Sequence, residues 1–328
     1  MKLGTLQNDS NLDGDLVVVS QDNKWAVKAG KIAPTMQLAL ENWEKVSSDL
    51  SGLYDSLNSG NCDGKFEVDE DKFHSPLPRA YQWADGSAYI HHIKLVRKAR
   101  NAPLPETLET VPLMYQGGSD HFLTPKQDIP QIDFSHGTDF EGEVAVIVGD
   151  VPMGVSEDEA PRFIKLLMIV NDVSLRGLIP DELKAGFGFF HGKPPTAFAP
   201  FAVTPDELGD AWKGARLHLP LLVNYNDEFF GNADAGAMHF HFGQLISHAA
   251  RTRPLKAGTI IGSGTVSNED MERGSSCLAE RRMLEKIHEG VIKTPFMKEG
   301  DKVKIEMHNA KNENIFGTIE QKVVKVDV

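Results

Sequence analysis

The chain has 328 residues, of which 41% are hydrophobic, and this is enough for a sizeable core in one large domain or two unequal ones. Its formal net charge of -13, from 47 acidic and 34 basic residues, disfavours nucleic acid as a partner, because a polyanion would be repelled. A small anionic substrate is still compatible with this charge, because a local cationic pocket can outweigh it.

The cysteine content and the apolar runs point to a reducing compartment and away from a membrane. Only Cys62 and Cys277 are present, so no disulfide framework is implied. Polar residues follow soon after Met1 and no apolar h-region is present, so we expect no signal peptide. The densest apolar run, Leu166–Val170, is too short to span a bilayer. We expect a cytoplasmic protein with no membrane partner.

The first part of the chain combines strands with one helix. Asp15–Ser20 and the residues around Trp25–Val27 predict two strands. Apolar residues at spacings of three and four then predict a single helix with one apolar stripe; they are Met36, Leu40, Trp43, Val46, Leu50, Leu53 and Leu57. Turn-forming residues fill positions 58–64, and the pattern changes from about Ser75 onward. We therefore predict a small N-terminal domain, 1–74, and a larger catalytic domain, 75–328.

The larger part consists mainly of short strands between Pro/Gly turns. We predict strands at Glu143–Val148, Ile169–Val173, Leu219–Asn224 and Thr259–Gly262. Ser156–Glu159 has the pattern of a capping box and predicts a helix through Leu166. Alternating apolar residues in the tail predict two antiparallel strands. The helices look few and peripheral, so the expected class is a β-rich α+β protein.

Four acidic residues have unusual surroundings for surface charge. Glu141 and Glu143 lie two positions apart at the start of an apolar strand, so their side chains point to the same face. Asp172 adjoins an apolar run and Asp85 lies in a predicted turn, Trp83–Gly86. Like charges this close require a compensating cation or proton, and oxygen ligands suit Mg²⁺, Mn²⁺ or Ca²⁺. From spacing alone, an exposed strand face and a turn cap remain the alternative.

Three other features are weaker. His239 and His241 have the spacing of a cupin-like iron site but lack convincing further ligands, so we expect solvated histidines. Cys277 has no nucleophile-elbow motif around it, which favours a small buried residue. Gly262–Gly264 lacks a phosphate-loop pattern and favours a tight turn that brings backbone amides near a site. His91 is expected to be solvated.

Segments spread over residues 75 to 328 together resemble the fumarylacetoacetate hydrolase family. The matching stretches, in the family's order, are 85–92, 115–118, 139–143, 170–176, 192–193 and 262–267. The first part of the chain is similar, more loosely, to the small leading domain of some members. The resemblance implies a catalytic domain built as a mixed β-sandwich roll, preceded by a small β/helix domain.

The resemblance also assigns roles. It implies that the metal ligands are Asp85, Glu141, Glu143 and Asp172. It places the catalytic histidine at His92, not at His91, and its glutamate partner at Glu280. Lys193 matches a lysine near metal and substrate, and Tyr115 and Thr265 match substrate contacts.

The sequence departs from the animal enzyme of the family at three positions. The substrate-contacting glutamine has no match, because the equivalent spacing falls on Ile179. The tyrosine two residues after the first aspartate is Ser87. The arginine after the catalytic histidine is displaced by one residue, so Arg97 and Arg100 both remain candidates. These departures leave the reaction class in place and put the exact substrate in doubt.

The resemblance implies a hydrolase that uses one divalent cation to cleave a carbon–carbon bond in a β-diketo acid. His92, held by Glu280, would activate water; Lys193, or Arg100, would stabilise the carbanion that leaves. The first expectation is cleavage of fumarylacetoacetate to fumarate and acetoacetate in tyrosine breakdown, by a homodimer. Acylpyruvate hydrolysis and the decarboxylation, hydration or isomerisation of a 2-oxo acid are the alternatives. A non-catalytic metal-binding protein is disfavoured, because pure binding needs no acid–base pair.

Overall fold

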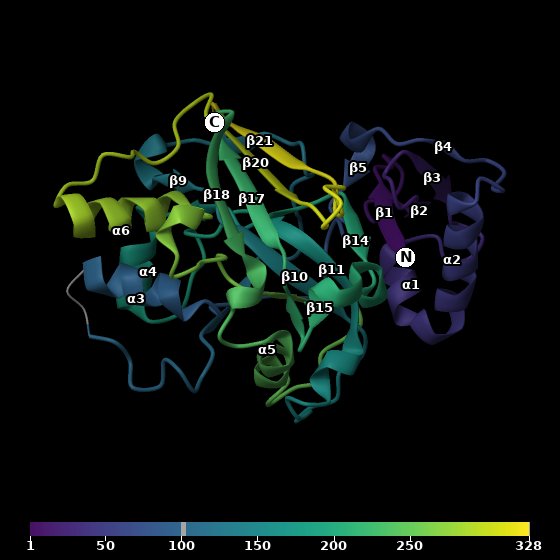
Figure 1. Ribbon diagram of the computed structural model, residues 1–328, viewed down its shortest axis with the longest axis horizontal. Helices are drawn as coiled ribbons and strands as arrows, with labels where there is room; N and C mark the ends of the chain where they lie inside the picture. The colour runs from purple at the N-terminus through teal and green to yellow at the C-terminus, as the bar shows by residue number, and fades with distance from the viewer. Residues whose placement is uncertain (100–102, 328) are drawn as a thin grey trace.

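The computed structural model describes residues 1–99 and 103–327, and its largest sheet joins the N-terminal part to the centre of the molecule (Figure 1). The main path of this twelve-stranded sheet has the order β4-β3-β2-β1-β14-β11-β10-β19-β6-β7. Its strands are β1 Lys2–Leu6, β2 Asp15–Val19, β3 Trp25–Lys28, β4 Phe66–Glu67, β6 Trp83–Gly86, β7 Met114–Gly117, β10 Gly142–Val148, β11 Ile164–Asn171, β14 Phe201–Val203 and β19 Ile260–Gly262. Two further strands lie beside this path, β5 Phe73–His74 on β1 and β13 Ala197–Phe198 on β11.

A second, five-stranded sheet contains the C-terminal part of the chain, in the order β18-β17-β20-β21-β8. Its strands are β8 Ile129–Gln131, β17 Pro220–Tyr225, β18 Glu228–Asp234, β20 Lys302–Met307 and β21 Ile319–Lys325. Strands β20 and β21 pair antiparallel, as the alternating tail predicts. The β-rich α+β class is confirmed.

The N-terminal part, on the right in Figure 1, joins the rest through β1, which pairs antiparallel with β14. Two helices, α1 (Met36–Glu41) and α2 (Trp43–Asn58), stand where a single helix was predicted. The prediction was wrong at Asn42, whose backbone leaves the helical region with φ -116° and ψ 21°. Strands from before and after the predicted boundary between residues 74 and 75 belong to the same sheet. The domain division there therefore remains a prediction.

The helix predicted from Ser156 through Leu166 does not form. The Ser156 hydroxyl accepts a hydrogen bond from the Glu159 amide, but only a short 3₁₀ turn, Ala160–Phe163, follows before β11. The apolar run is fully buried in the middle of the sheet, where β11 pairs with β10 along its length. A strand buried on both faces is apolar along its whole length and shows no helical spacing. Burial of this run in the sheet therefore outweighs the local helix signal.

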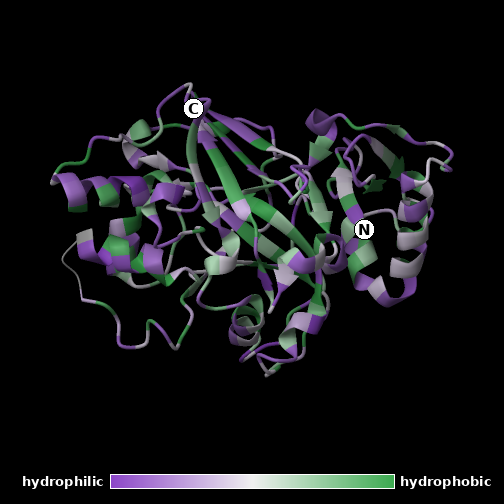
Figure 2. Cartoon of the chain, in the orientation of Figure 1, coloured by the Kyte–Doolittle hydropathy of each residue, from purple (hydrophilic) through white to green (hydrophobic). Residues whose placement is uncertain are grey.

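The remaining helices are peripheral, as expected. Helices α3 (Ile90–Ala99), α4 (Ile179–Ala185) and α6 (Leu278–Glu289) gather at one end of the molecule, away from the N-terminal part, and α3 packs against α6 (Figure 1). The central strands are hydrophobic over most of their length, and polar residues dominate the outer turns of α6 (Figure 2). None of the helices in the described ranges is long and apolar enough to cross a membrane.

Candidate active site

A cavity of about 210 Å³ opens beside α3 and α4, at the end of the central strands. Its lining combines polar and apolar residues. The polar lining comprises Asp85, Ser87, Tyr89, His92, Tyr115, Glu141, Glu143, Arg176, Lys193 and Thr265. The apolar wall comprises Ile93, Val96, Ile179, Leu183, Phe189 and Ala279. The cavity thus brings together residues that lie almost two hundred positions apart in the sequence.

Asp85, Glu143 and Asp172 converge at the polar side. One carboxylate oxygen from each lies within 4.8 Å of the others, and all three side chains are buried. Their strands explain the convergence: β10, which carries Glu143, pairs with β11 on one side and with β19 on the other, and β19 pairs with β6. Asp85 lies in β6, so the turn predicted at this position was wrong.

Two glycines make room for the Asp85 carboxylate. A Cβ at Gly262 would lie 2.3 Å from Asp85 Oδ1, far inside van der Waals contact. Gly264, at a φ of +77°, donates its backbone N–H to the same oxygen at 3.0 Å. The Gly264 amide thus faces the carboxylates, as predicted for this segment, but no tight turn forms: Gly262 ends strand β19 (Ile260–Gly262), and the backbone bends only at Thr265.

Glu141 lies next to the trio and faces two cations. Lys193 Nζ is 2.5 Å from both Glu141 Oε2 and Asp172 Oδ2, and Arg176 donates to Glu141 Oε1 at 2.5 Å. Burial alone would raise the pKa of Glu141, but Arg176 and Lys193 together hold it well below its ordinary value. Glu141 is therefore ionised at neutral pH.

For Asp85 and Glu143 the attraction of Lys193 does not outweigh burial and the neighbouring carboxylates. Burial, reinforced by the neighbouring carboxylates, raises the pKa of both groups well above their ordinary values. Both oxygens of Glu143 are buried, and neither has a hydrogen-bond partner among the described residues. A buried carboxylate without partners is costly unless a proton or cation neutralises it. The donor set therefore fits a divalent cation with a preference for oxygen ligands.

His92 and Glu280 form a pair at the other end of the cavity. His92 Nδ1 lies 2.8 Å from Glu280 Oε2; the histidine side chain is 18% exposed and the glutamate 1%. His92 is carried by α3 and Glu280 by the first turn of α6. A run of helix-forming residues closed by Gly290, in the left-handed region at φ 77°, was the signal that identifies this helix.

The sequence analysis assigned no role to Asp139 or Arg176, although both lie in the matching stretches. The buried Asp139 carboxylate accepts the backbone N–H groups of Leu278 at 2.8 Å and Ala279 at 2.9 Å, at the start of α6. It also accepts a hydrogen bond from Arg176 Nε at 2.9 Å. Because Arg176 also binds Glu141, this chain of contacts joins the start of α6 to the carboxylate group.

Some of the side chains predicted to contact substrate line the cavity, and Arg97 does not. Tyr115, Thr265 and Lys193 line the cavity. The Tyr115 hydroxyl donates to Asp172 Oδ2 at 2.6 Å. Arg97 donates instead to the backbone carbonyl of Pro103 and is not part of the lining. Arg100 lies outside the described residues.

Two further residues singled out in the sequence, Cys277 and His241, are N-cap residues of helices. Cys277 is buried, as expected, and its sulfur accepts the Glu280 amide at the N-terminus of α6. His241 is not simply solvated: its side chain caps helix α5 (Phe242–Ala249) in a capping box with Gln244. Among the described residues, neither His239 nor His241 belongs to a group of side chains that could hold a metal ion.

Comparison with known proteins gives matches along most of the chain. Residues 82–324 match the family model described as "Fumarylacetoacetate (FAA) hydrolase C-terminal", and residues 1–79 match "Fumarylacetoacetase N-terminal domain 2". A 2,4-didehydro-3-deoxy-L-rhamnonate hydrolase from Sphingomonas sp. (strain SKA58) is 31% identical over 50% of this chain, and the match spans 55% of that relative's length. The oxaloacetate tautomerase YisK of Bacillus subtilis (strain 168) is 24% identical over 84% of this chain and 78% of its own length.

Solved structures share the fold over its full extent. A maleylpyruvate hydrolase from Sphingobium sp. SYK-6 superposes with a TM-score of 0.66 at 14% identity, covering 99% of this chain and all of the other. The same hydrolase in complex with manganese(II) and pyruvate gives a TM-score of 0.65 at 15% identity, covering all of both chains.

Proposed function

Because the chain belongs to the fumarylacetoacetate hydrolase family, we propose that it is a divalent-metal-dependent hydrolase that cleaves the carbon–carbon bond of a small 2,4-dioxo acid. The observation that carries this proposal is that His92, which is bound by Glu280, lines the same cavity as Asp85 and Glu143, the carboxylates grouped with Asp172. A binding protein has no use for an acid–base pair at this position.

The residues of the chain account for each proton in the proposed cleavage. His92, held by Glu280, takes a proton from water, whose oxygen bonds to the C4 carbonyl carbon. The C3–C4 bond then breaks, C3 keeps the electron pair as an enolate, and the His92 imidazolium returns the proton to C3. Lys193, which lines the cavity, would stabilise the enolate charge. A cation held by Asp85, Glu141, Glu143 and Asp172 would supply Lewis-acid polarisation of the dicarbonyl.

The shape of the cavity favours an acyl tail over a second carboxylate. Its apolar lining consists of Ile93, Val96, Ile179, Leu183 and Phe189. The two cations in the described lining, Arg176 and Lys193, are already paired with carboxylates of the protein. Desolvating a carboxylate against such a wall is costly without a partner. We therefore favour an acylpyruvate, cleaved to pyruvate and a carboxylic acid. Cleavage of fumarylacetoacetate, which has a carboxylate at each end, remains a prediction that the assay below tests.

The complex of the Sphingobium hydrolase with manganese(II) and pyruvate supports this reaction class, as does the 2,4-didehydro-3-deoxy-L-rhamnonate hydrolase among the relatives. A tautomerase is the second candidate, because the relative named oxaloacetate tautomerase matches 84% of this chain. Such a reaction uses the same His92–Glu280 pair to move a proton at carbon without attack by water. The proposed homodimer has no support beyond the family and is tested by light scattering.

A substrate panel separates these activities. Purified protein with Mn²⁺ or Mg²⁺ is given acetylpyruvate, fumarylacetoacetate or oxaloacetate, and pyruvate release, diketone loss and enol–keto conversion are followed separately. The expected result is rapid release of pyruvate from acetylpyruvate and its loss in a His92→Ala control. Faster turnover of fumarylacetoacetate would overturn the proposed substrate class. Enol–keto conversion without bond cleavage would overturn hydrolysis itself.

A further inference from the structure

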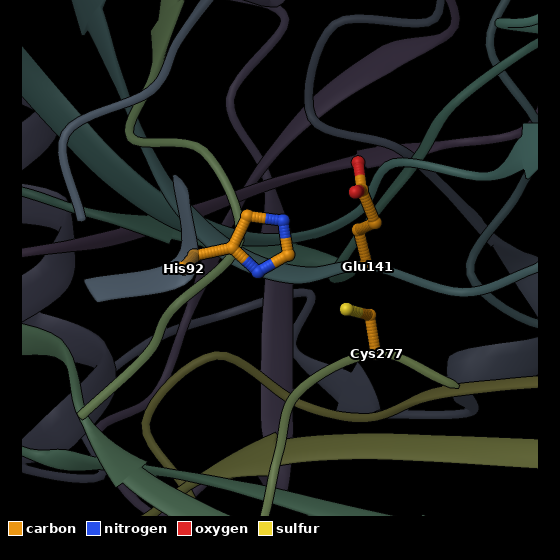
Figure 3. Close-up of side chains that lie close together, drawn as sticks. All are labelled: His92, Glu141 and Cys277. Atoms are coloured by element: carbon orange, nitrogen blue, oxygen red, sulfur yellow. The ribbon is translucent and has the colours of Figure 1, made fainter. Parts of the chain in front are cut away.

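The segment that follows α4, positions 186–193, carries two side chains that line the cavity. The Phe189 ring lies edge-on to the Tyr115 ring, with 5.3 Å between the ring centroids, and forms part of the apolar lining. Lys193 Nζ lies 5.1 Å from the centre of the same Tyr115 ring and donates to Glu141. The side chains of Glu141 and His92 lie close together (Figure 3). The segment therefore runs from the apolar lining to the carboxylates beside the proposed base.

A single carboxylate holds the second half of this segment. Glu182, in the first turn of α4, accepts the backbone N–H groups of Phe190 at 3.0 Å, His191 at 2.6 Å and Gly192 at 3.1 Å. A carboxylate has two oxygens and about four lone-pair sites, so it can accept all three bonds at once. Hydrogen bonds to an ionised acceptor are stronger than neutral ones, and the Glu182 side chain is only 15% exposed. This side chain therefore fixes the path of the backbone between Phe189 and Lys193.

The first half of the segment has open space around its glycines. Gly186 and Gly188 have φ values of 77° and 99°, in the left-handed region, and a Cβ at either position would meet no described atom within 4 Å. The segment holds three phenylalanines, yet Phe189 alone belongs to the described cavity lining, and Phe187 and Phe190 are 100% and 80% exposed. The carboxylate contacts, which begin directly after Phe189, therefore decide which ring faces the cavity.

We propose that Phe189 is a specificity-determining residue for the acyl tail of the substrate and that Glu182 is the positioning residue that keeps its ring at the cavity. An apolar tail would lie against this ring and gain on the order of fourfold in affinity for each methylene that it buries. The preferred substrates are therefore acylpyruvates with an acyl group longer than acetyl. The identity of the substrate rests on the proposed function, whereas binding of the tail requires no turnover.

The test measures the binding of 2-oxo acids to the Mn²⁺-loaded protein by isothermal titration. 2-Oxohexanoate has the tail of an acylpyruvate but lacks the carbonyl group that water attacks, and pyruvate is the reference without a tail. We expect 2-oxohexanoate to bind the wild type at least roughly tenfold more tightly than pyruvate. In Phe189→Ala and in Glu182→Gln this ratio should fall toward one. The ratio is the readout, because Glu182→Gln also displaces Lys193 and can weaken the binding of both acids.

Two matched controls separate this role from general effects. Phe190→Ala removes the neighbouring exposed ring, and Asp181→Asn removes a charge from the same turn of α4, where the Asp181 side chain is 87% exposed. Both variants should keep the wild-type ratio. A ratio lost equally in Phe190→Ala would overturn the assignment to Phe189, and an unchanged ratio in Glu182→Gln would overturn the positioning role.

Melting curves identify any variant that fails to fold. Gly192→Ala then tests the same contact from the other side, because its new Cβ would lie 2.8 Å from Glu182 Oε2 and should also lower the ratio. Equal affinities of the wild type for the two acids would overturn the tail site. A preserved preference for 2-oxohexanoate together with an inactive substrate panel would overturn only the proposed hydrolysis.

Discussion

The carboxylates on the central strands and the His92–Glu280 pair on the helices are held in place in different ways. Asp85, Glu143 and Asp172 repel one another, yet they stay together because neighbouring strands of the central sheet fix their backbones. His92 and Glu280 attract one another, and they lie on two helices packed at the edge of the fold. A sheet with ladder hydrogen bonds on both sides can hold like charges in place, whereas the helix-borne pair depends on its own contact.

Because of this difference, we expect substitutions in the two groups to impair different properties of the protein. A carboxylate removed from the strand end leaves the backbone in place but weakens cation binding. A residue removed from the helix end leaves cation binding in place but removes proton transfer. Asp139 is where the two ends are joined, since it binds both the start of α6 and Arg176.

The largest effect is expected at the strand end. Asp172→Ala should remove the divalent cation and lower turnover by about 10³-fold or more, because Lewis-acid stabilisation contributes several kcal/mol and each 1.36 kcal/mol is tenfold. Isothermal titration with Mn²⁺, together with the acetylpyruvate assay, measures both effects. Chelator should inactivate the wild type reversibly. Retention of full Mn²⁺ affinity in the variant would show that Asp172 is not a ligand.

At the helix end, His92→Ala should lower turnover by about 10²–10⁴-fold, the usual contribution of a general base. Mn²⁺ affinity and melting temperature should stay close to those of the wild type, because His92 is not one of the proposed ligands of this cation. The matched control is His91→Ala, the neighbouring histidine on the same helix, which should cost much less. If His91→Ala proves the more damaging change, the assignment of the base to His92 fails.

Substitution of Asp139, which joins the two groups, should have an intermediate effect on activity. Asp139→Asn keeps the size of the side chain but weakens its contacts with Arg176 and the α6 amides, so turnover should fall about 10–100-fold, as for other supporting groups. Mn²⁺ affinity should fall less than in Asp172→Ala. The pH profile of kcat should also shift, because Glu280 is carried by α6 and orients His92. An unchanged profile with reduced stability alone would reduce Asp139 to a structural role.

The smallest effect concerns stability and pH. The folded protein holds the pKa values of Asp85 and Glu143 above their ordinary 3.8 and 4.5, so it binds more protons than the unfolded chain above those values. The contribution of these groups to stability therefore falls as pH rises from about 4.5 toward neutrality. In chelator the melting temperature should fall over this range more than in Mn²⁺, since a bound cation replaces the proton.

Glu143→Gln is the control for this pH effect. A neutral amide has no proton to lose, so the variant in chelator should show a shallower decline in melting temperature between pH 5 and 8 than the wild type. Identical slopes for the two proteins would show that Glu143 is not responsible for the difference.

Some of the local structure was predictable because its signals are local. The strand at Glu143–Val148 and the paired tail strands follow from apolar patterns that match a buried or half-buried sheet. The helix predicted after Ser156 failed because a capping pattern of four residues carries less free energy than burying Leu166–Val170 between two strands. The break at Asn42 was likewise invisible in an apolar stripe that continues across it.

By itself, the sequence determined the class of the fold, the family motifs and the residue types at the candidate site, because these depend on order and spacing along the chain. Tertiary structure alone decided which charges are compensated: Lys193 and Arg176 stand beside Glu141 and leave Glu143 without a partner. It also decided that Glu280 reaches His92 from a helix 188 positions away. Electrostatic and hydrogen-bond energies depend on distances across space, and these are set only when the sheet and its helices pack.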